Sequence, residues 1–577
     1  MAQYKADYIR GAAMINNMSR FRHGLISASL FVLSLSVTAC GGGGGGDTAP
    51  PPATKMSQTD ATRLASQSSF GATEVSVAAM QTQSVDAFLA TQFAAPASNY
   101  NGFSYVAPTA PPKCKAEAGN PGSAASICAR DNYSPFQLQR RFFQNALTEQ
   151  DQLRQRVAFA LGQMVVVSGT EINQAYGMAA YQQLLLDHSF GNFRDLLYAV
   201  TLSPAMGRYL DMVNNDKPDP IKGTEPNENY ARELLQLFSI GVYELNANGL
   251  QKLDGNGKAI PTYDQDIIEG FAHIFTSWTY APRPGQPTKK HNPLNYEGQM
   301  QVLASNHDAD AKQLLNGTII SAGQTPEKDL NDAIDNIFQH PNIGPLIGKQ
   351  LIQHLVTANP SPDYVARVTA AFNENDQGVR GDMKAIIRAI LTDTEARGDQ
   401  KTDVNYGHLR EPALFTTHLL KALHGNSDGV YLRNQGSAME QAVFVAPSVF
   451  NFYPPDHVLP GDTLLSPESA ILNSTSAINR ANFVSTLVFS NNGIAPDANV
   501  AGATGTQIDL SDLQTLAATP ENLVDEIARR LLGSALSSTS RAAVIQAVNA
   551  VAATDSLNRA RTAVYLVALS PNYQVER

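Results

Sequence analysis

Apolar residues recur every three or four positions along most of this chain, which is the spacing of an amphipathic α-helix. The clearest case is 135–167, where one apolar series includes Phe142 and another begins at Val157, so two helices are predicted there. Two helices are likewise predicted within 57–92 and within 176–202. Single helices are predicted over 227–241, 262–278, 330–339, 345–357, 362–374, 383–391, 411–424, 521–532, 540–552 and 557–569.

Strand patterns, by contrast, are few and short. Residues 299–303 alternate between polar and apolar and 313–320 are short and apolar, so we expect a hairpin around His307. The sequence contains no internal repeat, and it contains no clean linker between Thr54 and the C-terminus. The chain is therefore expected to be mainly α, with one large multi-helix domain over 61–577, a small β-hairpin element and long ordered loops. Loops are predicted at 111–134, 281–297 and 446–468, and a flexible surface insert at 491–507.

The first forty residues predict export. Basic residues from Arg20 onward precede an apolar run over 25–39, which has the length of a signal peptide and is too short to span a bilayer. The run ends in Val-Thr-Ala followed by Cys40, which resembles a bacterial lipobox with Cys40 as the lipidated residue. We expect a signal peptide over 1–39 and a lipid anchor with a Gly/Pro-rich tether over 40–60. The protein would then be anchored to a bacterial membrane, facing the periplasm or the cell surface, with the outer membrane favoured; the alternative is a soluble secreted protein.

Two further cysteines, Cys114 and Cys128, are separated by a short stretch rich in Gly, Ala and Ser. In an exported protein such a pair is typical of a disulfide that closes a surface loop, and free thiols are the alternative. Two cysteines are too few for a structural zinc site of the usual kind.

The charge balance bears on partners. The chain has 42 basic and 52 acidic side chains, a net charge of -10, which repels a phosphate backbone. We therefore expect no nucleic-acid partner.

The first segment with candidate chemistry lies in the helix predicted over 227–241. Asn227 is placed to cap it, and Glu228 and Arg232 stand four apart as an ion pair. Glu233 falls beside the apolar stripe, where a partly buried carboxylate has a raised pKa unless it is paired. The functional interpretation is an acid/base or metal-binding carboxylate, and the structural one is an internal salt bridge or helix-cap ligand.

The second segment is the helix predicted over 262–278, which a capping box from Thr262 to Gln265 would open. Glu269 and His273 are four apart, so that their side chains can meet and could bind a metal or move protons. The alternative is a surface pair without function. The spacing of two histidines in a His-Glu-x-x-His protease is missing.

The third segment places His307, Asp308 and Lys312 in one polar turn between short strands, an arrangement typical of functional loops. It is not an EF-hand, because the glycine and the distal glutamate are missing. Asn227, Glu228, Arg232 and Lys312 are expected to have structural roles.

These segments match, in order along the chain, the signatures of one family, together with 152–161, 190–192, 204–210, 410–412, 447–453 and 570–573. The set resembles the bacterial family called domain of unknown function 1800, from about residue 61 to the C-terminus. One departure is Ser277, where the family usually has glycine before the tryptophan. We expect this difference to alter the geometry of the helix end more than the chemistry.

The resemblance implies an exported, mainly helical protein and supplies no established activity and no agreed catalytic residues. Members are often encoded beside an exported protein with a sulfatase-like fold, which implies such a protein as a partner in an envelope or extracellular pathway.

Two functions from different classes fit these observations. The first is an envelope or extracellular hydrolase or lyase that acts on a polymer, with a divalent metal as a candidate cofactor. The second is a non-catalytic assembly or binding lipoprotein, in which the polar clusters hold helices together. The acid/base or metal residues of the first would be Glu233, Glu269, His273, His307 and Asp308.

Overall fold

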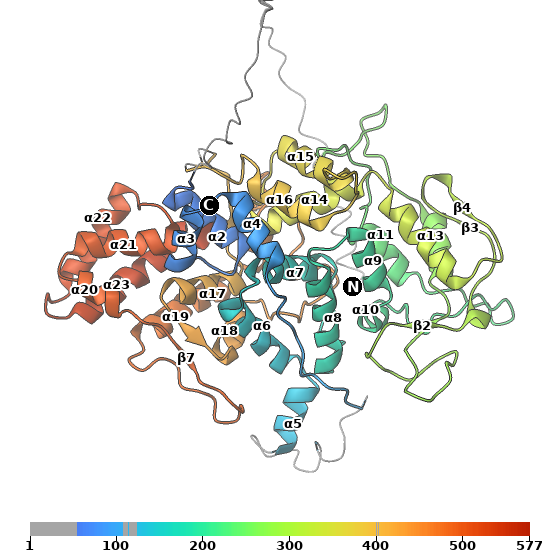
Figure 1. The fold of residues 1–577 in the computed structure, drawn as a ribbon, viewed down its shortest axis with the longest axis horizontal. Helices are drawn as coiled ribbons and strands as arrows, with labels where there is room; N and C mark the ends of the chain where they lie inside the picture. Colours follow the sequence, from blue (N-terminus) through green and yellow to red (C-terminus); the bar gives the residue numbers. More distant parts are fainter. Residues whose placement is uncertain (1–54, 108–113, 115–123, 400, 402) are drawn as a thin grey trace, which may run out of the picture. The chain divides into compact units, whose positions relative to one another are not determined.

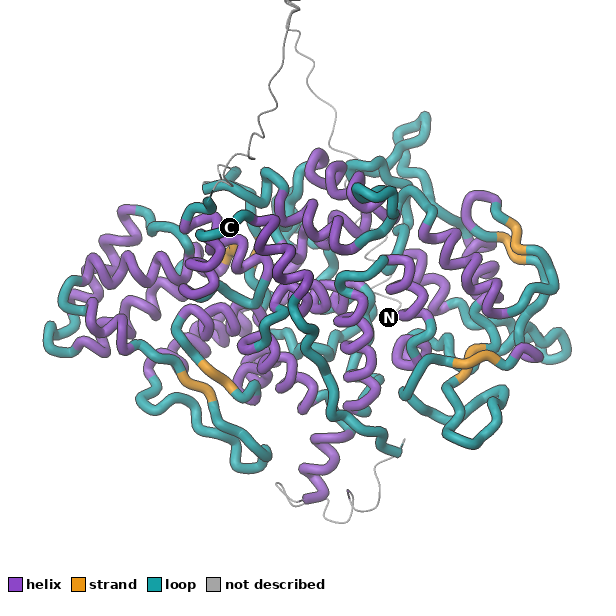
Figure 2. The backbone as a smooth tube through the Cα atoms, viewed as in Figure 1, coloured by secondary structure: helices purple, strands orange, loops and turns teal. Residues whose placement is uncertain are grey.

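The computed structural model describes residues 55–107, 114, 124–399, 401 and 403–577. The predicted signal peptide, Cys40 and most of the tether lie outside the described residues. The described part is mainly α, which confirms the fold class predicted from the periodicity (Figure 1, Figure 2). No helix in it combines the length and the apolar character needed to cross a lipid bilayer.

In the first half the predicted helices are present, and two further helices, over Ala124–Asn132 and Pro204–Tyr209, were not predicted. Residues 57–92 form three helices rather than two, because Thr73 and Ser84 each cap a new helix with their side chains. The helices are α2 (Gln58–Ser68), α3 (Glu74–Gln81), α4 (Val85–Ala94), α5 (Ala124–Asn132), α6 (Phe136–Thr148), α7 (Gln152–Met164), α8 (Ala175–His188), α9 (Phe193–Thr201), α10 (Pro204–Tyr209), α11 (Asn229–Gln236) and α12 (Gln265–Ile274).

The second half contains the remaining helices. Four of these were not predicted: α18 and α19, whose apolar periodicity is interrupted by small and polar residues, and the short helices α20 and α24. The helices are α13 (Pro326–Phe338), α14 (Ile343–Leu355), α15 (Pro362–Asn373), α16 (Met383–Thr392), α17 (Pro412–Ala422), α18 (Val430–Ala438), α19 (Ser474–Phe489), α20 (Ser511–Leu516), α21 (Pro520–Leu532), α22 (Ser538–Ala550), α23 (Ser556–Leu569) and α24 (Pro571–Gln574).

The segment that carries the two cysteines differs from the predicted loop. The disulfide between Cys114 and Cys128 is present, and Cys128 lies within α5. The region expected to be a loop over 111–134 therefore includes a helix. α5 packs against α6 and α8, so the disulfide ties Cys114 to an element that is itself packed on the helical core (Figure 1).

Two antiparallel strand pairs correct the predicted hairpin. β1 (Trp278–Thr279) pairs with β2 (Gln301–Val302), and β3 (Lys312–Gln313) pairs with β4 (Ile319–Ile320). The two segments that were expected to pair with each other have different partners, because two-residue strands carry too little alternation to fix a register. The other pairs in the described chain are β5 (His408–Leu409) with β8 (Val575–Glu576) and β6 (Asn426–Ser427) with β7 (Thr506–Gln507).

The predicted flexible insert at 491–507 makes defined backbone contacts. Ile494 and Thr506 exchange two backbone hydrogen bonds of 2.7 and 3.0 Å. The carboxylate of Asp428 accepts hydrogen bonds from the backbone N–H groups of Thr504 and Gly505, at 2.9 and 2.8 Å. Composition alone did not reveal this order, because its anchor lies on a distant part of the chain.

The two helices with candidate chemistry begin differently from the prediction. Asn227 Oδ1 accepts a hydrogen bond from the backbone N–H of Asn229, but the N-cap of α11 is Glu228. The helix ends at Gln236 with Leu237 as its C-cap, so Gly241, which has a left-handed φ of +75°, lies beyond the helix end and does not terminate it. In α12 the cap is Asp264, whose side chain accepts from the backbone N–H of Ile267 at 3.2 Å. The predicted capping box at Thr262 is therefore wrong, because the nearer carboxylate takes this position.

A glycine sets how closely α12 approaches the strands. A Cβ atom at Gly270 would lie 2.0 Å from the carbonyl oxygen of Gln313 on β3, closer than any side chain tolerates. Only glycine lets the helix and the strand lie this close together. The contact places the end of α12 beside the turn from His307 to Lys312.

A residue just beyond α12 is strained. Ser277 is the third residue after the end of α12; it has φ +77° and is 1% exposed, and its buried hydroxyl has no hydrogen-bond partner among the described residues. Left-handed backbone costs an ordinary L-residue roughly 1–2 kcal/mol. At this position the resemblance described above leads one to expect glycine, and glycine adopts a left-handed φ without this strain.

We expect Ser277→Gly to be more stable than Ser277→Ala by about 1 kcal/mol, because both remove the hydroxyl and only glycine relieves the left-handed strain. Chemical denaturation of both variants measures the difference. Equal stabilities would show that the backbone at this position carries no strain.

Candidate functional site

A connected set of polar side chains joins the end of α12 to the turn that follows η3 (Ala304–Asn306). His273, in the last turn of α12, forms a hydrogen bond through Nδ1 to Oδ2 of Asp308. The hydroxyl of Thr276 donates to the carbonyl oxygen of His273 at 2.7 Å and accepts from the backbone N–H of Asp308 at 3.0 Å. Thr276 therefore fixes the backbone on both sides of the His273–Asp308 pair.

The interior end of this set is an ion cluster centred on Asp329. Oδ2 of Asp329 lies 2.8 Å from Lys312 Nζ and 3.0 Å from His307 Nε2. Lys312 Nζ also donates to the carbonyl oxygens of Asp308 and Asp310, each at 2.8 Å. The side chains of Asp329, Lys312 and His307 are all almost completely buried. Lys312 therefore contacts both the buried carboxylate of Asp329 and the backbone at Asp308, and so links the two aspartates.

Asp329 was not predicted from the sequence to be part of this cluster. It lies in the first turn of α13, three residues after the start of the helix at Pro326, and Thr325 caps that helix. An acidic residue in this place is usual because it complements the helix dipole. Nothing local marks it as a partner of Lys312. The only available signal was the need of a buried lysine for a carboxylate.

Both aspartates hold their negative charge. Burial raises the pKa of Asp308, but the hydrogen bonds from His273 and from the backbone N–H of Asp310, with the charge of Lys312, outweigh burial and lower it to about 2. Burial likewise opposes ionisation of Asp329, and hydrogen bonds with His307 and Lys312 lower its pKa below the ordinary value. Both carboxylates are therefore ionised at neutral pH.

The geometry gives His273 a defined chemical role. Its side chain is 27% exposed, whereas that of Asp308 is 7% exposed. An ionised carboxylate can only accept, so in its neutral form the imidazole donates its Nδ1 proton to Asp308 and carries its lone pair on Nε2. An oriented, partly accessible imidazole of this kind can act as a general base.

The other predicted site residues lie in different contacts. Glu269 is exposed and accepts a hydrogen bond from Gln265 Nε2 at 3.1 Å, so the expected Glu269–His273 pair does not form. Glu233 is buried on α11, where its charge helps to raise the pKa values of Tyr209 and Tyr263, although burial is the larger cause. Of the five candidates, His273, His307 and Asp308 are brought into one connected set.

The residues expected to be structural hold α11 in place. Glu228 Oε2 lies 2.6 Å from Arg232 Nη2, the ion pair predicted from their spacing. Gln265 links this pair to α12, because its Nε2 donates to Glu228 Oε1 at 3.0 Å. Asn227 exchanges hydrogen bonds with Asn215, its N–H donating to Asn215 Oδ1 at 2.8 Å.

A second histidine–aspartate pair lies near the first and is far more exposed. His291 Nε2 is 2.9 Å from Asp216 Oδ1, and Lys290 Nζ is 3.0 Å from Asp216 Oδ2. Asn306, the residue before His307, donates to the same Asp216 at 3.0 Å. The side chains of His291 and Asp216 are 51% and 39% exposed, so water competes for their hydrogen bonds.

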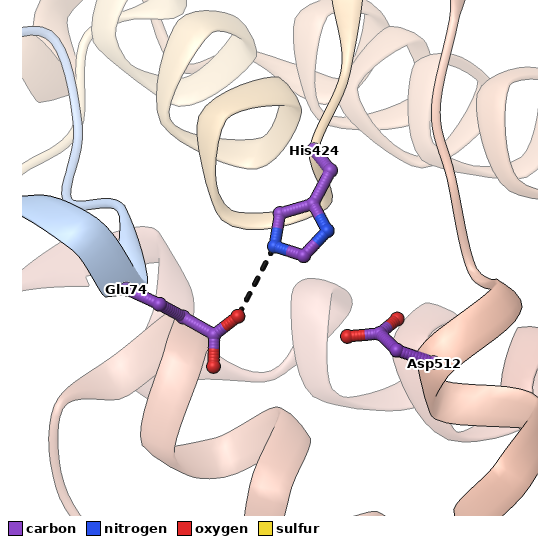
Figure 3. Close-up of side chains that lie close together, drawn as sticks. All are labelled: Glu74, His424 and Asp512. Carbon is purple, nitrogen blue, oxygen red and sulfur yellow. Dashed lines mark hydrogen bonds and ion pairs between the residues drawn. The ribbon is translucent and has the colours of Figure 1, made fainter.

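Among the described residues, Glu74, His424 and Asp512 lie close enough together for their side chains to bind one metal ion. Figure 3 shows His424 between the two carboxylates, with its Nε2 3.1 Å from Glu74 Oε2. Two guanidinium groups already compensate these charges: Arg529 bonds Glu74, and Arg530 bonds Asp512. A divalent cation would have to displace both arginines, which weakens the group as a metal site.

Another polar cluster lies in the interior, where several of the family-like segments meet. Glu411 accepts a hydrogen bond from Tyr453 Oη at 2.8 Å, and Arg156 donates to the carbonyl oxygen of His354. Burial raises the pKa of Glu411, and the charge of Arg156 opposes this rise. Arg156, Glu411 and Tyr453 are all buried, so these segments stabilise the packing of α7, α14 and α17.

A comparison of the sequence with protein families shows the family to which this chain belongs. The family described as Protein of unknown function (DUF1800) matches residues 63–575, nearly the whole chain. The chain belongs to the DUF1800 family. The match includes both the His273–Asp308 pair and the buried cluster around Glu411. No curated protein and no solved structure matches the chain.

We expect Asp329→Asn to lower the free energy of unfolding by about 3 kcal/mol or more, because it leaves the Lys312 charge buried without a compensating anion. The matched control is Asp332→Asn on the same helix, which breaks the exposed Lys328–Asp332 pair and should cost less than about 1 kcal/mol. Denaturant unfolding measures both. Similar losses in the two variants would contradict the buried-charge interpretation.

The depressed pKa of Asp308 also predicts a pH dependence of stability. Its ionised form is favoured by folding, so this contribution is complete above the ordinary pKa of 3.8 and is lost as the pH falls toward about 2. Asp308→Asn should therefore lose less stability than the unaltered protein between about pH 5 and pH 2. Unfolding curves at several pH values test this, and parallel losses would show that Asp308 titrates normally.

Proposed function

We propose that this DUF1800 protein is an exported, lipid-anchored bacterial enzyme, a hydrolase or lyase that acts on a polymer in the envelope or outside the cell. His273 is its general base and Asp308 orients that base. Export and anchoring rest on the signal-like segment and on Cys40, as argued from the sequence. The reaction class rests on the chemistry of one oriented imidazole.

The observation that carries the proposal is the difference in exposure between His273 and its partner. Asp308 is held in place at both its backbone and its side chain. Its backbone N–H donates to Thr276 and its carbonyl oxygen accepts from Lys312. Its side-chain Oδ1 accepts from the backbone N–H of Asp310 at 2.9 Å. A carboxylate fixed in this way holds the ring in one orientation and stabilises the imidazolium that forms when Nε2 takes a proton. Because the ring is partly exposed, a substrate can reach it.

In hydrolysis, His273 Nε2 takes a proton from water while the oxygen forms a bond to the reacting carbon. The bond between that carbon and the leaving group breaks, its electron pair goes to the leaving group, and the imidazolium, stabilised by Asp308, gives the leaving group this proton. In a lyase the same nitrogen takes a proton from carbon, and the bond to the leaving group breaks. Glu269, exposed and one helical turn away on α12, is the second titratable group that a bound polymer would meet. A divalent metal is a candidate cofactor.

We expect His273→Gln and Asp308→Asn to lower the rate of polymer cleavage about a hundredfold or more, because the first removes the base and the second removes its orientation. The matched control is His291→Gln, which removes a histidine from the exposed pair with Asp216 and should leave the rate unchanged.

The assay incubates residues 48–577 with a panel of bacterial and plant cell-wall polysaccharides. New reducing ends report glycoside cleavage, and ultraviolet absorbance of unsaturated products reports elimination. If a cleaved polymer is found and both His273→Gln and Asp308→Asn cleave it at the original rate, the proposed site is wrong.

The second candidate is a non-catalytic assembly or binding lipoprotein, with an exported sulfatase-like protein as its proposed partner. The specific observation in its favour is that Arg156, Glu411 and Tyr453, which lie in family-like segments, are buried and make structural contacts. This candidate predicts that His273→Gln leaves co-purification with the partner intact. Loss of the partner with this variant would argue against it.

A further inference from the structure

The described part of the protein contains a polar hollow of about 290 Å³ that is separate from the His273–Asp308 pair. It lies between α5, α6 and α8 and the segment 101–104, and its volume is close to the lower end of the range for small-molecule sites. In Figure 1, α5 lies at the lower edge of the helices, whereas α13, β3 and β4 lie at the right. The hollow is thus a second candidate site.

Arginines give this hollow a positive character. Arg140 and Arg141 line it, and Arg141 forms no ion pair with any residue that the structure describes. The carboxylate that lines it, Asp131, is already paired with Arg130 at 2.7 Å. In a chain of net charge -10, this excess of guanidinium groups favours an anionic ligand.

The remaining wall fits a ligand rich in hydroxyl groups. The amide side chains of Asn101 and Gln144 line the hollow and make no side-chain hydrogen bond to a described residue. Each amide both donates and accepts, which suits the vicinal hydroxyls of a sugar. Phe103 and Tyr176 add aromatic surface to the same wall, and Tyr176 is held in place by Tyr105 and Tyr296. Rigid aromatic rings with free amides and a guanidinium are suited to a charged saccharide.

We propose that this hollow binds a carboxylated saccharide unit, such as a uronate. Arg141 contacts the carboxylate, and Asn101 and Gln144 bond the hydroxyls. Such a site anchors an acidic polysaccharide away from the His273–Asp308 pair. The binding itself does not depend on the proposed enzymatic activity.

Isothermal titration calorimetry of residues 48–577 with trigalacturonate tests the site. Its fully methyl-esterified form is the control ligand, with the same ring and no charge. We expect saturable binding of the acid, binding of the ester weakened about tenfold or more, and the same loss for the acid with Arg141→Gln. Gln144→Glu, which adds a negative charge to the wall, should abolish binding.

The matched control is Arg388→Gln on α16, which removes one positive charge from an exposed pair with Asp86 on α4. It should leave binding unchanged, and thermal unfolding checks that all variants fold. Absence of saturable binding, equal binding of acid and ester, or equal effects of Arg141→Gln and Arg388→Gln would each overturn the proposal. Displacement of trigalacturonate by equimolar inorganic phosphate would overturn the saccharide assignment. If His273→Gln loses polymer cleavage but still binds trigalacturonate, the saccharide site is separate from the proposed catalytic pair.

Discussion

Asp329 carries a negative charge into the interior of the protein, and the geometry of the candidate site depends on how that charge is compensated. Lys312 and His307 converge on its Oδ2 atom, and Lys312 also holds the carbonyl oxygens of Asp308 and Asp310. A buried ion cluster of this kind is a poor source of net stability, because desolvation opposes the Coulomb attraction. It is a strong constraint on position, however, and the position it fixes is that of the carboxylate facing His273.

The sequence allowed the helices to be predicted better than the strands, and the reason is physical. A helix such as α13 or α23 repeats its apolar residues over several turns, so several independent positions in the local sequence each indicate the helix. The strands are two residues long, and their partners are chosen by tertiary contacts such as the close approach of Gly270 to Gln313. Helices α18 and α19 were missed because their periodicity is weak and packing decides their state.

The candidate site could be predicted only as separate pieces. Spacing along α12 indicated Glu269 as the partner of His273, but the partner is Asp308, which lies beyond the end of the helix. His307 and Asp308 stood out because they share one turn. Asp329 did not, since its role arises from a contact across 22 residues of chain with His307, and periodicity carries no information about such contacts. Local pattern therefore finds polar residues, and only the fold determines which of them meet.

The end of α12 concentrates features that oppose stability. Ser277 has a left-handed backbone and a buried hydroxyl without a described partner. Gly270 permits close packing against β3 but lowers the helix propensity of α12. Asp329 is a buried charged residue. Strain of this kind persists only where the surrounding structure over-determines it, and it gathers where geometry matters more than stability. Three accessible histidines pair with carboxylates in the described chain, at Asp308, Asp216 and Glu74. Of these carboxylates Asp308 is the buried one, so the strained backbone lies beside the one accessible histidine whose carboxylate partner is held in the interior.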